Sequence, residues 1–85
     1  MSIFRRTPDG GWRLATCDER VAEHVRMAHS ARIVSRRVPA LADYCREVFE
    51  KEMSLARGIR VLQHEGVYAD DGRVIPQCAE ITEEE

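Results

Sequence analysis

The stretch PALADYCREVFEKEMSLARGIRVLQHE, residues 39–65, decides the fold of this chain. Its apolar residues alternate between spacings of four and three, the heptad pattern of a helix that packs one seam against a neighbour. Proline suits the first turn of a helix and glycine the position just after its end, so Pro39 and Gly66 mark the limits. The stretch predicts one long amphipathic helix with a single polar break in its seam. The seam positions are Leu41, Cys45, Val48, Glu52, Leu55, Ile59 and Leu62.

The length of this helix leaves two alternatives. As one piece it would span about 40 Å, at ~1.5 Å per residue. A compact domain of this size is only about 30 Å across. The helix therefore either breaks, with Gly58 as the expected point, or protrudes with an apolar seam that needs a partner. We expect a protruding helix whose seam packs in a homodimer.

A shorter helix is predicted upstream. Thr16 and Glu19 fit a capping box, in which a hydroxyl and a carboxylate satisfy the first free amides of a helix. Apolar residues then recur at helical spacing from Val21 to Ala28. The segment Ser30–Val38 is either the last turns of this helix or an extended connector. A residue before proline disfavours the helical conformation, so the helix should end before Pro39.

Two turn signals predict β-hairpins at the ends of the chain. Pro-Asp-Gly-Gly at 8–11 separates short apolar runs, with Ile3, Trp12 and Leu14 expected on one buried face. Asp-Gly at 71–72 separates the runs 67–69 and 73–75, and Pro76 limits the second strand to a sheet edge. The two hairpins are expected to join one sheet against the helices. The predicted fold is a single small α+β domain over residues 1–81, followed by an acidic tail over 82–85.

Charge is unevenly distributed along the sequence. Residues 1–37 hold eight arginines and four acidic residues, a net charge of +4. Residues 38–85 hold five basic and eleven acidic residues, a net charge of −6. Either folding interleaves the two halves and cancels the polarity, or the basic half contacts phosphates while the acidic half engages a basic protein.

No motif for catalysis or metal binding is present. The three cysteines and three histidines lack the paired spacing of zinc ligands, and no glycine-rich phosphate loop occurs. We therefore expect no enzyme, no cofactor and no metal. The sequence has no apolar run long enough to cross a membrane and no apolar leader, which predicts a cytoplasmic protein with reduced cysteines. These cysteines are Cys17, Cys45 and Cys78.

The expected function is therefore protein binding. A small chain with polarised charge, an amphipathic helix and no catalytic motif is typical of regulatory proteins, such as accessory or inhibitor proteins of phages and other mobile elements. The expected partner-binding surface lies on the long helix. Its residues are Tyr44, Glu47, Phe49, Glu50, Glu52, Leu55 and Ile59.

The alternative function is DNA binding. The order of helix, Gly66 and hairpin resembles the end of a winged-helix domain, whose second helix reads the major groove. This resemblance implies a winged-helix-like or antitoxin-like dimeric regulator, with an affinity that falls steeply with salt. The candidate phosphate contacts are Arg32, Arg36, Arg37, Arg57, Arg60 and Arg73.

Overall fold

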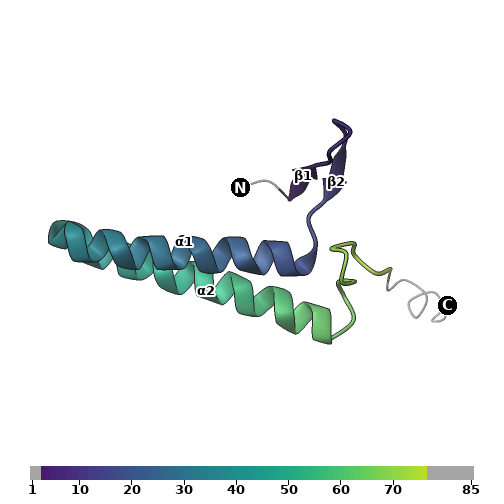
Figure 1. The fold of residues 1–85 in the computed structure, drawn as a ribbon. Helices are drawn as coiled ribbons and strands as arrows, with labels where there is room; N and C mark the ends of the chain where they lie inside the picture. The colour runs from purple at the N-terminus through teal and green to yellow at the C-terminus, as the bar shows by residue number, and fades with distance from the viewer. Residues whose placement is uncertain (1–2, 77–85) are drawn as a thin grey trace.

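The computed structural model describes residues 3–76. Two antiparallel helices, α1 (Cys17–Arg37) and α2 (Ala42–His64), lie side by side (Figure 1). A 3-10 turn, η1 (Pro39–Leu41), joins them at one end, which we call the tip. Two short strands, β1 (Phe4–Arg6) and β2 (Trp12–Leu14), precede α1 at the opposite end, which we call the open end. The result is a small α+β fold that is elongated, with extents of 57 × 39 × 16 Å.

The N-terminal β-hairpin forms as the sequence predicts. β1 and β2 pair antiparallel, with Phe4 opposite Leu14. The turn needs the left-handed backbone of Gly10, whose φ is 90°. Asp9 closes the turn, because its carboxylate accepts a hydrogen bond from the Thr7 hydroxyl.

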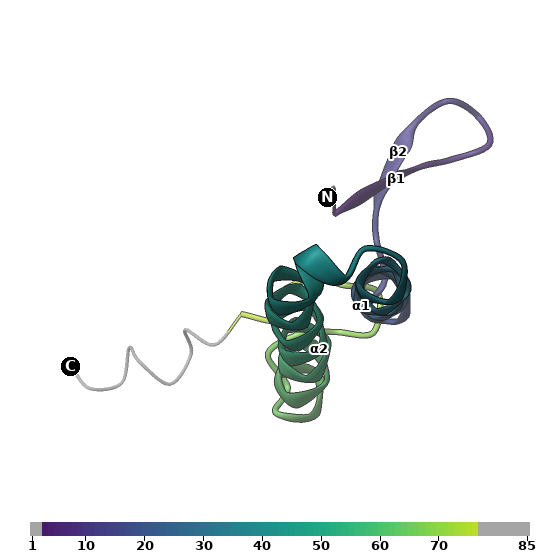
Figure 2. The ribbon, with the colours of Figure 1, turned by 90° about the vertical axis from the view of Figure 1, so that its left-hand side faces the viewer.

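The predicted burial of this hairpin is wrong. Trp12 is 64% exposed, and Ile3 is exposed as well. The Arg6 guanidinium covers one face of the Trp12 ring at 5.3 Å from its centre. Figure 2 shows the reason: the hairpin stands away from the helix pair, so no layer among the described residues covers it.

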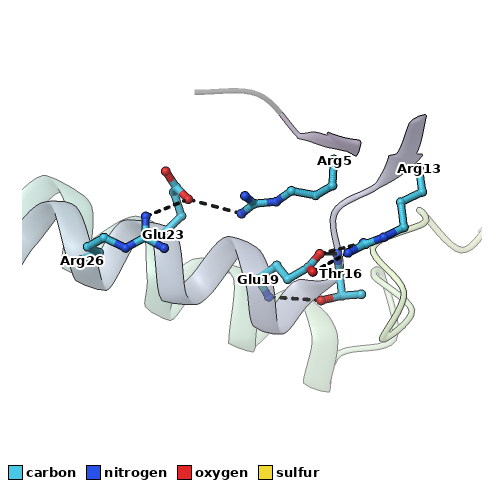
Figure 3. Close-up of polar contacts among 6 residues, drawn as sticks. All are labelled: Arg5, Arg13, Thr16, Glu19, Glu23 and Arg26. Carbon is cyan, nitrogen blue, oxygen red and sulfur yellow. Dashed lines mark hydrogen bonds and ion pairs between the residues drawn. The ribbon is translucent and has the colours of Figure 1, made fainter. Parts of the chain in front are cut away.

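Ion pairs anchor the β-hairpin to α1 instead of an apolar contact (Figure 3). Arg13 donates to both carboxylate oxygens of Glu19, at 2.8 and 2.6 Å. Arg5 lies 3.2 Å from Oε1 of Glu23, and Arg26 donates to the same oxygen from within α1. These polar contacts hold the hairpin without burying it.

The first helix begins at the predicted capping box. The N–H of Glu19 donates to the Thr16 hydroxyl at 3.1 Å, and the N–H of Thr16 donates to Glu19 Oε1 at 2.9 Å. The segment Ser30–Val38, left open by the sequence, continues the helix almost to its end. The helix stops where expected, because Val38 takes an extended conformation (φ −129°, ψ 82°) before Pro39.

Acid should weaken the start of α1. The Arg13 guanidinium, followed by the N–H of Thr16, lowers the pKa of Glu19 from 4.5 to about 2. A carboxylate whose pKa is lower in the folded state stabilises the fold above its unfolded pKa, and this contribution is lost as pH falls from about 4.5 towards 2. We expect the urea midpoint, followed by circular dichroism, to fall between about pH 5 and pH 3. In Glu19→Gln the midpoint should already be lower at pH 5 and fall less. An equal fall in both proteins would contradict this assignment.

The second helix is continuous. Gly58 lies inside α2, so the helix does not break there. Instead the whole molecule is long, which agrees with the alternative of a protruding helix. Gly66 ends the helix with a φ of 84°, and the N–H of Val67 then donates back to the carbonyl of Leu62 at 2.8 Å.

The predicted seam divides between the contact with α1 and one flank of α2. Cys45 and Glu52 are buried and Ile59 is half-buried, whereas Leu41 and Leu55 are 43% and 44% exposed. Small side chains at a helix contact let the axes approach closely and leave larger neighbours outside it. The buried side chains between the helices are Ala28, Ala31, Cys45, Glu52 and Ala56. The contact therefore contains no fully buried large side chain, and Cys17 is the largest fully buried one in the described part of the chain.

Of the predicted C-terminal hairpin, residues 66–76 show the turn and one antiparallel bridge but no pair of strands. Residues 66–76 contain a single antiparallel bridge, Tyr68 with Val74, and the two-stranded sheet of β1 and β2 does not include it. The backbone of this segment bonds across its own turn and also closes the open end. The carbonyl of Asp70 accepts from the N–H of Cys17 at 3.1 Å, and the carbonyl of Gly72 accepts from Arg20 at 3.1 Å. We call residues 66–76 the clasp, because they link the end of α2 to the start of α1 (Figure 1). The predicted acidic tail, 82–85, lies outside the described residues.

Candidate protein-binding surface

An apolar groove lies along one side of the helix pair near the tip. Its hollow has a volume of about 210 Å³. Both helices and the turn between them contribute to its walls. The lining residues are Met27, Ser30, Ala31, Val34, Leu41, Tyr44, Cys45 and Val48. We call this surface the apolar groove.

Large apolar side chains stay exposed around this groove. Met27 is 43% exposed, Val34 40% and Tyr44 65%. Scattered apolar residues are ordinary on a protein surface, but a contiguous patch marks a place where another molecule binds. The groove is therefore the strongest candidate for a binding surface in the described part of the chain.

The apolar surface continues from the groove towards the open end. Leu55 follows Val48 by seven residues and Leu62 follows Leu55 by seven, so helical geometry places them on the same side of α2. Both leucines are exposed. The groove and these leucines form one apolar strip along the molecule.

The other side of the helix pair carries the basic side chains of Arg32, Arg36 and Arg46. A hollow of about 410 Å³ lies there, and a neighbouring hollow of about 220 Å³ shares Arg32 with it. The Arg32 guanidinium lies over the Phe49 ring, 5.4 Å from its centre. The larger hollow is lined by Arg32, Ser35, Ala42, Cys45, Arg46, Phe49 and Glu50. The smaller one is lined by His29, Arg32, Ile33 and Arg36.

A polar pair lies inside the helix contact. Nδ1 of His24 is 2.6 Å from Oε1 of Glu52, and the two side chains are 14% and 12% exposed. The single polar break in the predicted seam is therefore bonded to the opposite helix. A carboxylate at this position requires such a partner, because an unpaired buried charge is strongly unfavourable.

The structure separates the predicted partner-binding residues. Tyr44 lines the groove and Leu55 extends its strip, whereas Phe49 and Glu50 line the basic hollow on the other side. Ile59 is half-buried, and Glu52 is bonded to His24 inside the helix contact. Glu47 is exposed. The predicted set therefore does not form one surface.

The predicted phosphate-binding arginines are also separated. Arg32, Arg36 and Arg37 lie in the last turns of α1 near the tip. Arg60 is at the other end of the molecule, 2.8 Å from Asp18 and bonded to Gln63. The remaining two lie near that end as well: Arg57 in α2, and Arg73 in the clasp, where it pairs with Asp71.

Folding cancels the charge polarity of the sequence only in part. The acidic residues in the first turns of α1 are paired with arginines from the β-hairpin and from α2. Arg36 and Arg37 have no ion pair among residues 3–76. Excess positive charge therefore remains at the tip.

The α1 wall of the groove is not part of the predicted site. Met27 and Val34 lie seven residues apart, the same repeat that links Leu41, Val48 and Leu55 on α2. This repeat was the available signal. It is weak, because α1 offers only two large residues at that spacing.

The described residues hold no other conventional site. Cys17 and Cys45 are free, buried thiols, as expected, and Cys78 lies outside the described part. Within residues 3–76, no three histidine, cysteine or acidic side chains gather as metal ligands would, and neither helix has the apolar length of a membrane span. Comparisons with protein-family models, with curated proteins and with solved structures give no match to this chain.

Proposed function

We propose that this chain is a non-enzymatic regulatory protein that acts by binding another protein through the apolar groove. The observation that carries the proposal is where the large apolar side chains lie: outside the contact between the helices rather than within it. The helix contact holds small residues, whereas Met27, Val34 and Tyr44 remain exposed beside it. Burying one such side chain completely stabilises a complex by about 1.5–3 kcal/mol.

The proposed role is that of an accessory or inhibitor protein in the cytoplasm. A binding surface without a catalytic constellation acts on a partner by occupying its surface or holding it in one state. The groove has two apolar walls about one helix diameter apart, a shape suited to an amphipathic helical surface.

Two adjacent residues of α1 allow a matched test. Val34 lines the groove, whereas Ile33 lines the smaller basic hollow, and the two are 40% and 51% exposed. Val34→Asp places a carboxylate in the groove, and Ile33→Asp places the same group outside it. We expect a tagged chain carrying Ile33→Asp to retain the proteins that the unchanged chain binds in a cell extract, and Val34→Asp to lose them. Circular dichroism of both variants shows whether the helices are intact.

Equal retention by the two variants would contradict the groove as the binding surface. The extract is divided into nuclease-treated and untreated halves, and bound proteins are identified by mass spectrometry. Proteins that survive nuclease and depend on Val34 support the proposal.

The second candidate function is that of a DNA-binding regulator. It is favoured by the positive charge at the tip, where no acidic residue occurs in the sequence between Glu23 and Asp43. The support comes from this positive charge rather than from the winged-helix outline, because residues 3–76 contain an antiparallel helix pair and a bridged clasp in place of a wing. Bound proteins that disappear with nuclease and do not depend on Val34 would favour this function.

A further inference from the structure

We infer that a second copy of this chain covers the apolar groove, packed antiparallel so that the tip of each copy lies towards the open end of the other. The inference rests on the proposed function, because it treats the groove as a protein-binding surface. It goes further by naming the occupant and its orientation.

The size of the apolar strip favours a pair of helices as the occupant. α1 has 21 residues and is about 30 Å long at ~1.5 Å per residue. Because the two-fold axis described below lies nearer the tip, about 15 residues of each helix overlap, and two helices about 10 Å apart then present a face of roughly 450 Å², smaller than the ~800 Å² per partner of a standard interface. A single short peptide in the hollow would leave Leu55 uncovered, whereas a second helix pair covers it.

Charged residues border the groove on both helices. On α1, Glu23 and Arg37 lie seven residues before and after Ser30, which lines the groove. On α2, Glu47 and Lys51 lie three residues after Tyr44 and Val48, which also line it. Residues three, four or seven apart share one side of a helix, so each border carries one acidic and one basic residue.

The positions of these charges make the face complementary to itself. The midpoint between Glu23 and Arg37 is Ser30, and the midpoint between Glu47 and Lys51 is Phe49. Ser30 and Phe49 are almost equally far along the chain from η1, so in this helical hairpin they lie at the same level. One two-fold axis across the helices at this level therefore brings opposite charges together on both borders.

The same axis also matches apolar residues. The midpoint between Met27 and Val34 is within one residue of Ser30, and the midpoint between Tyr44 and Leu55 is within one residue of Phe49. Met27 of one copy therefore meets Val34 of the other, and Tyr44 meets Leu55. A copy packed with both tips at the same end would set α1 against α2 and would bring neither pair together.

The first test is the mass of the full-length chain in solution. We expect sedimentation velocity at tens of micromolar to show a dimer. Val34→Asp should weaken the dimer at least about 100-fold, because two unpaired carboxylates enter the interface. Ile33→Asp, the matched control, should leave it unchanged. A monomeric chain would overturn the inference, and so would a dimer that is indifferent to Val34→Asp.

The second test uses charge reversal on α2 and does not depend on core packing. Glu47→Lys and Lys51→Glu each place like charges opposite one another at two related sites, so each homodimer should weaken about tenfold. A mixture of the two variants should form the heterodimer in preference to either homodimer. In the heterodimer, the two contacts on the α2 border and the two on the α1 border all join opposite charges. The α2 pair is chosen because Glu23 already binds Arg5 and Arg26.

The outcomes separate this inference from the proposed function. A chain that sediments as a monomer while Val34→Asp still abolishes capture of another protein overturns the second copy and leaves the groove as a binding surface. A dimer without preference for the mixed heterodimer overturns the antiparallel arrangement. A dimer and a capture that both ignore Val34 overturn the groove itself.

Discussion

Glu52→Ala is expected to lower the free energy of unfolding by about 3 kcal/mol, the largest effect of any single side-chain truncation in the helix contact. The reason is that His24 and Glu52 are bonded at 2.6 Å inside that contact. Removing one member of a buried pair leaves the other without its partner, at a cost of about 3–5 kcal/mol when burial is complete. Urea unfolding followed by circular dichroism measures the difference. Glu50→Ala, on the exposed face of the same helix, is the control and should change stability by less than about 0.5 kcal/mol.

Replacing both members of the pair should restore the lost stability. In His24→Leu with Glu52→Leu, neither polar group is left unpaired, and the apolar seam of α2 becomes continuous. Replacement of a buried pair by apolar residues is often neutral or stabilising, by about 1–4 kcal/mol. If the double variant is as unstable as Glu52→Ala, the pair contributes through its shape rather than through its bond.

Gly72→Ala should destabilise the clasp by on the order of 3 kcal/mol, because strain and a steric clash combine. Gly72 has a φ of 93°, which a residue with a side chain rarely adopts. A Cβ at this position would lie 2.2 Å from the carbonyl oxygen of Ala15, which belongs to the backbone between β2 and α1. The alanine therefore forces the clasp away from the start of α1 and breaks the contacts of Cys17 and Arg20 with it. Thermal unfolding and amide exchange at residues 15–20 measure the effect.

Two other glycines separate the two causes. Gly66 has a φ of 84°, but a Cβ at this position would have open space around it, so Gly66→Ala should show the strain without the clash. Gly58 lies inside α2 with open space around it, so Gly58→Ala should stabilise the protein by about 1 kcal/mol. The order Gly58→Ala, Gly66→Ala, Gly72→Ala should therefore run from most to least stable. Equal effects at Gly66 and Gly72 would show that the close approach to Ala15 is unimportant.

Local chemistry explains which elements the sequence could predict. The capping box of Thr16 and Glu19, the proline that stops α1 and the glycine turn of the first hairpin all act within a few residues of chain. Each therefore left a complete signal in the sequence. The continuity of α2 through Gly58 was open at that level, because the alternative depended on how compact the whole molecule is.

Tertiary packing explains what the sequence could not predict. The heptad pattern of α2 contains two rows of residues seven apart, one through Cys45, Glu52 and Ile59 and one through Leu41, Val48 and Leu55. The pattern alone does not show which row faces α1. The small residues Ala28 and Ala31 of α1 decide this, since they bring the helices close at Cys45 and leave Leu55 on the flank. Asp-Gly at 71–72 predicts the turn of the clasp, but it does not predict that the clasp also bonds to the start of α1. The carbonyls of Val67 and Arg73 accept across the clasp's own turn, whereas those of Asp70 and Gly72 accept from α1.

Two of the seven residues expected to bind a partner lie on the apolar strip. Tyr44 and Leu55 belong to the apolar strip, as expected from the pattern of α2. Phe49 lies at the basic hollow and Glu52 inside the helix contact, because the apolar pattern of α2 covers more than one face of the helix. The α1 wall was missed because a groove between two helices belongs to neither sequence pattern alone.

Two buried thiols mark the two ends of the helix pair. Cys17 is fully buried where α1 meets the clasp, and Cys45 is buried near the tip between the groove and the basic hollow. A thiol reagent can modify each only when its own end of the molecule opens, so their modification rates report two local opening reactions in one chain. With Cys78 replaced by serine, a partner or second copy in the groove should slow modification of Cys45 more than that of Cys17. The molecule therefore carries its own probes for which end is protected when the groove is occupied.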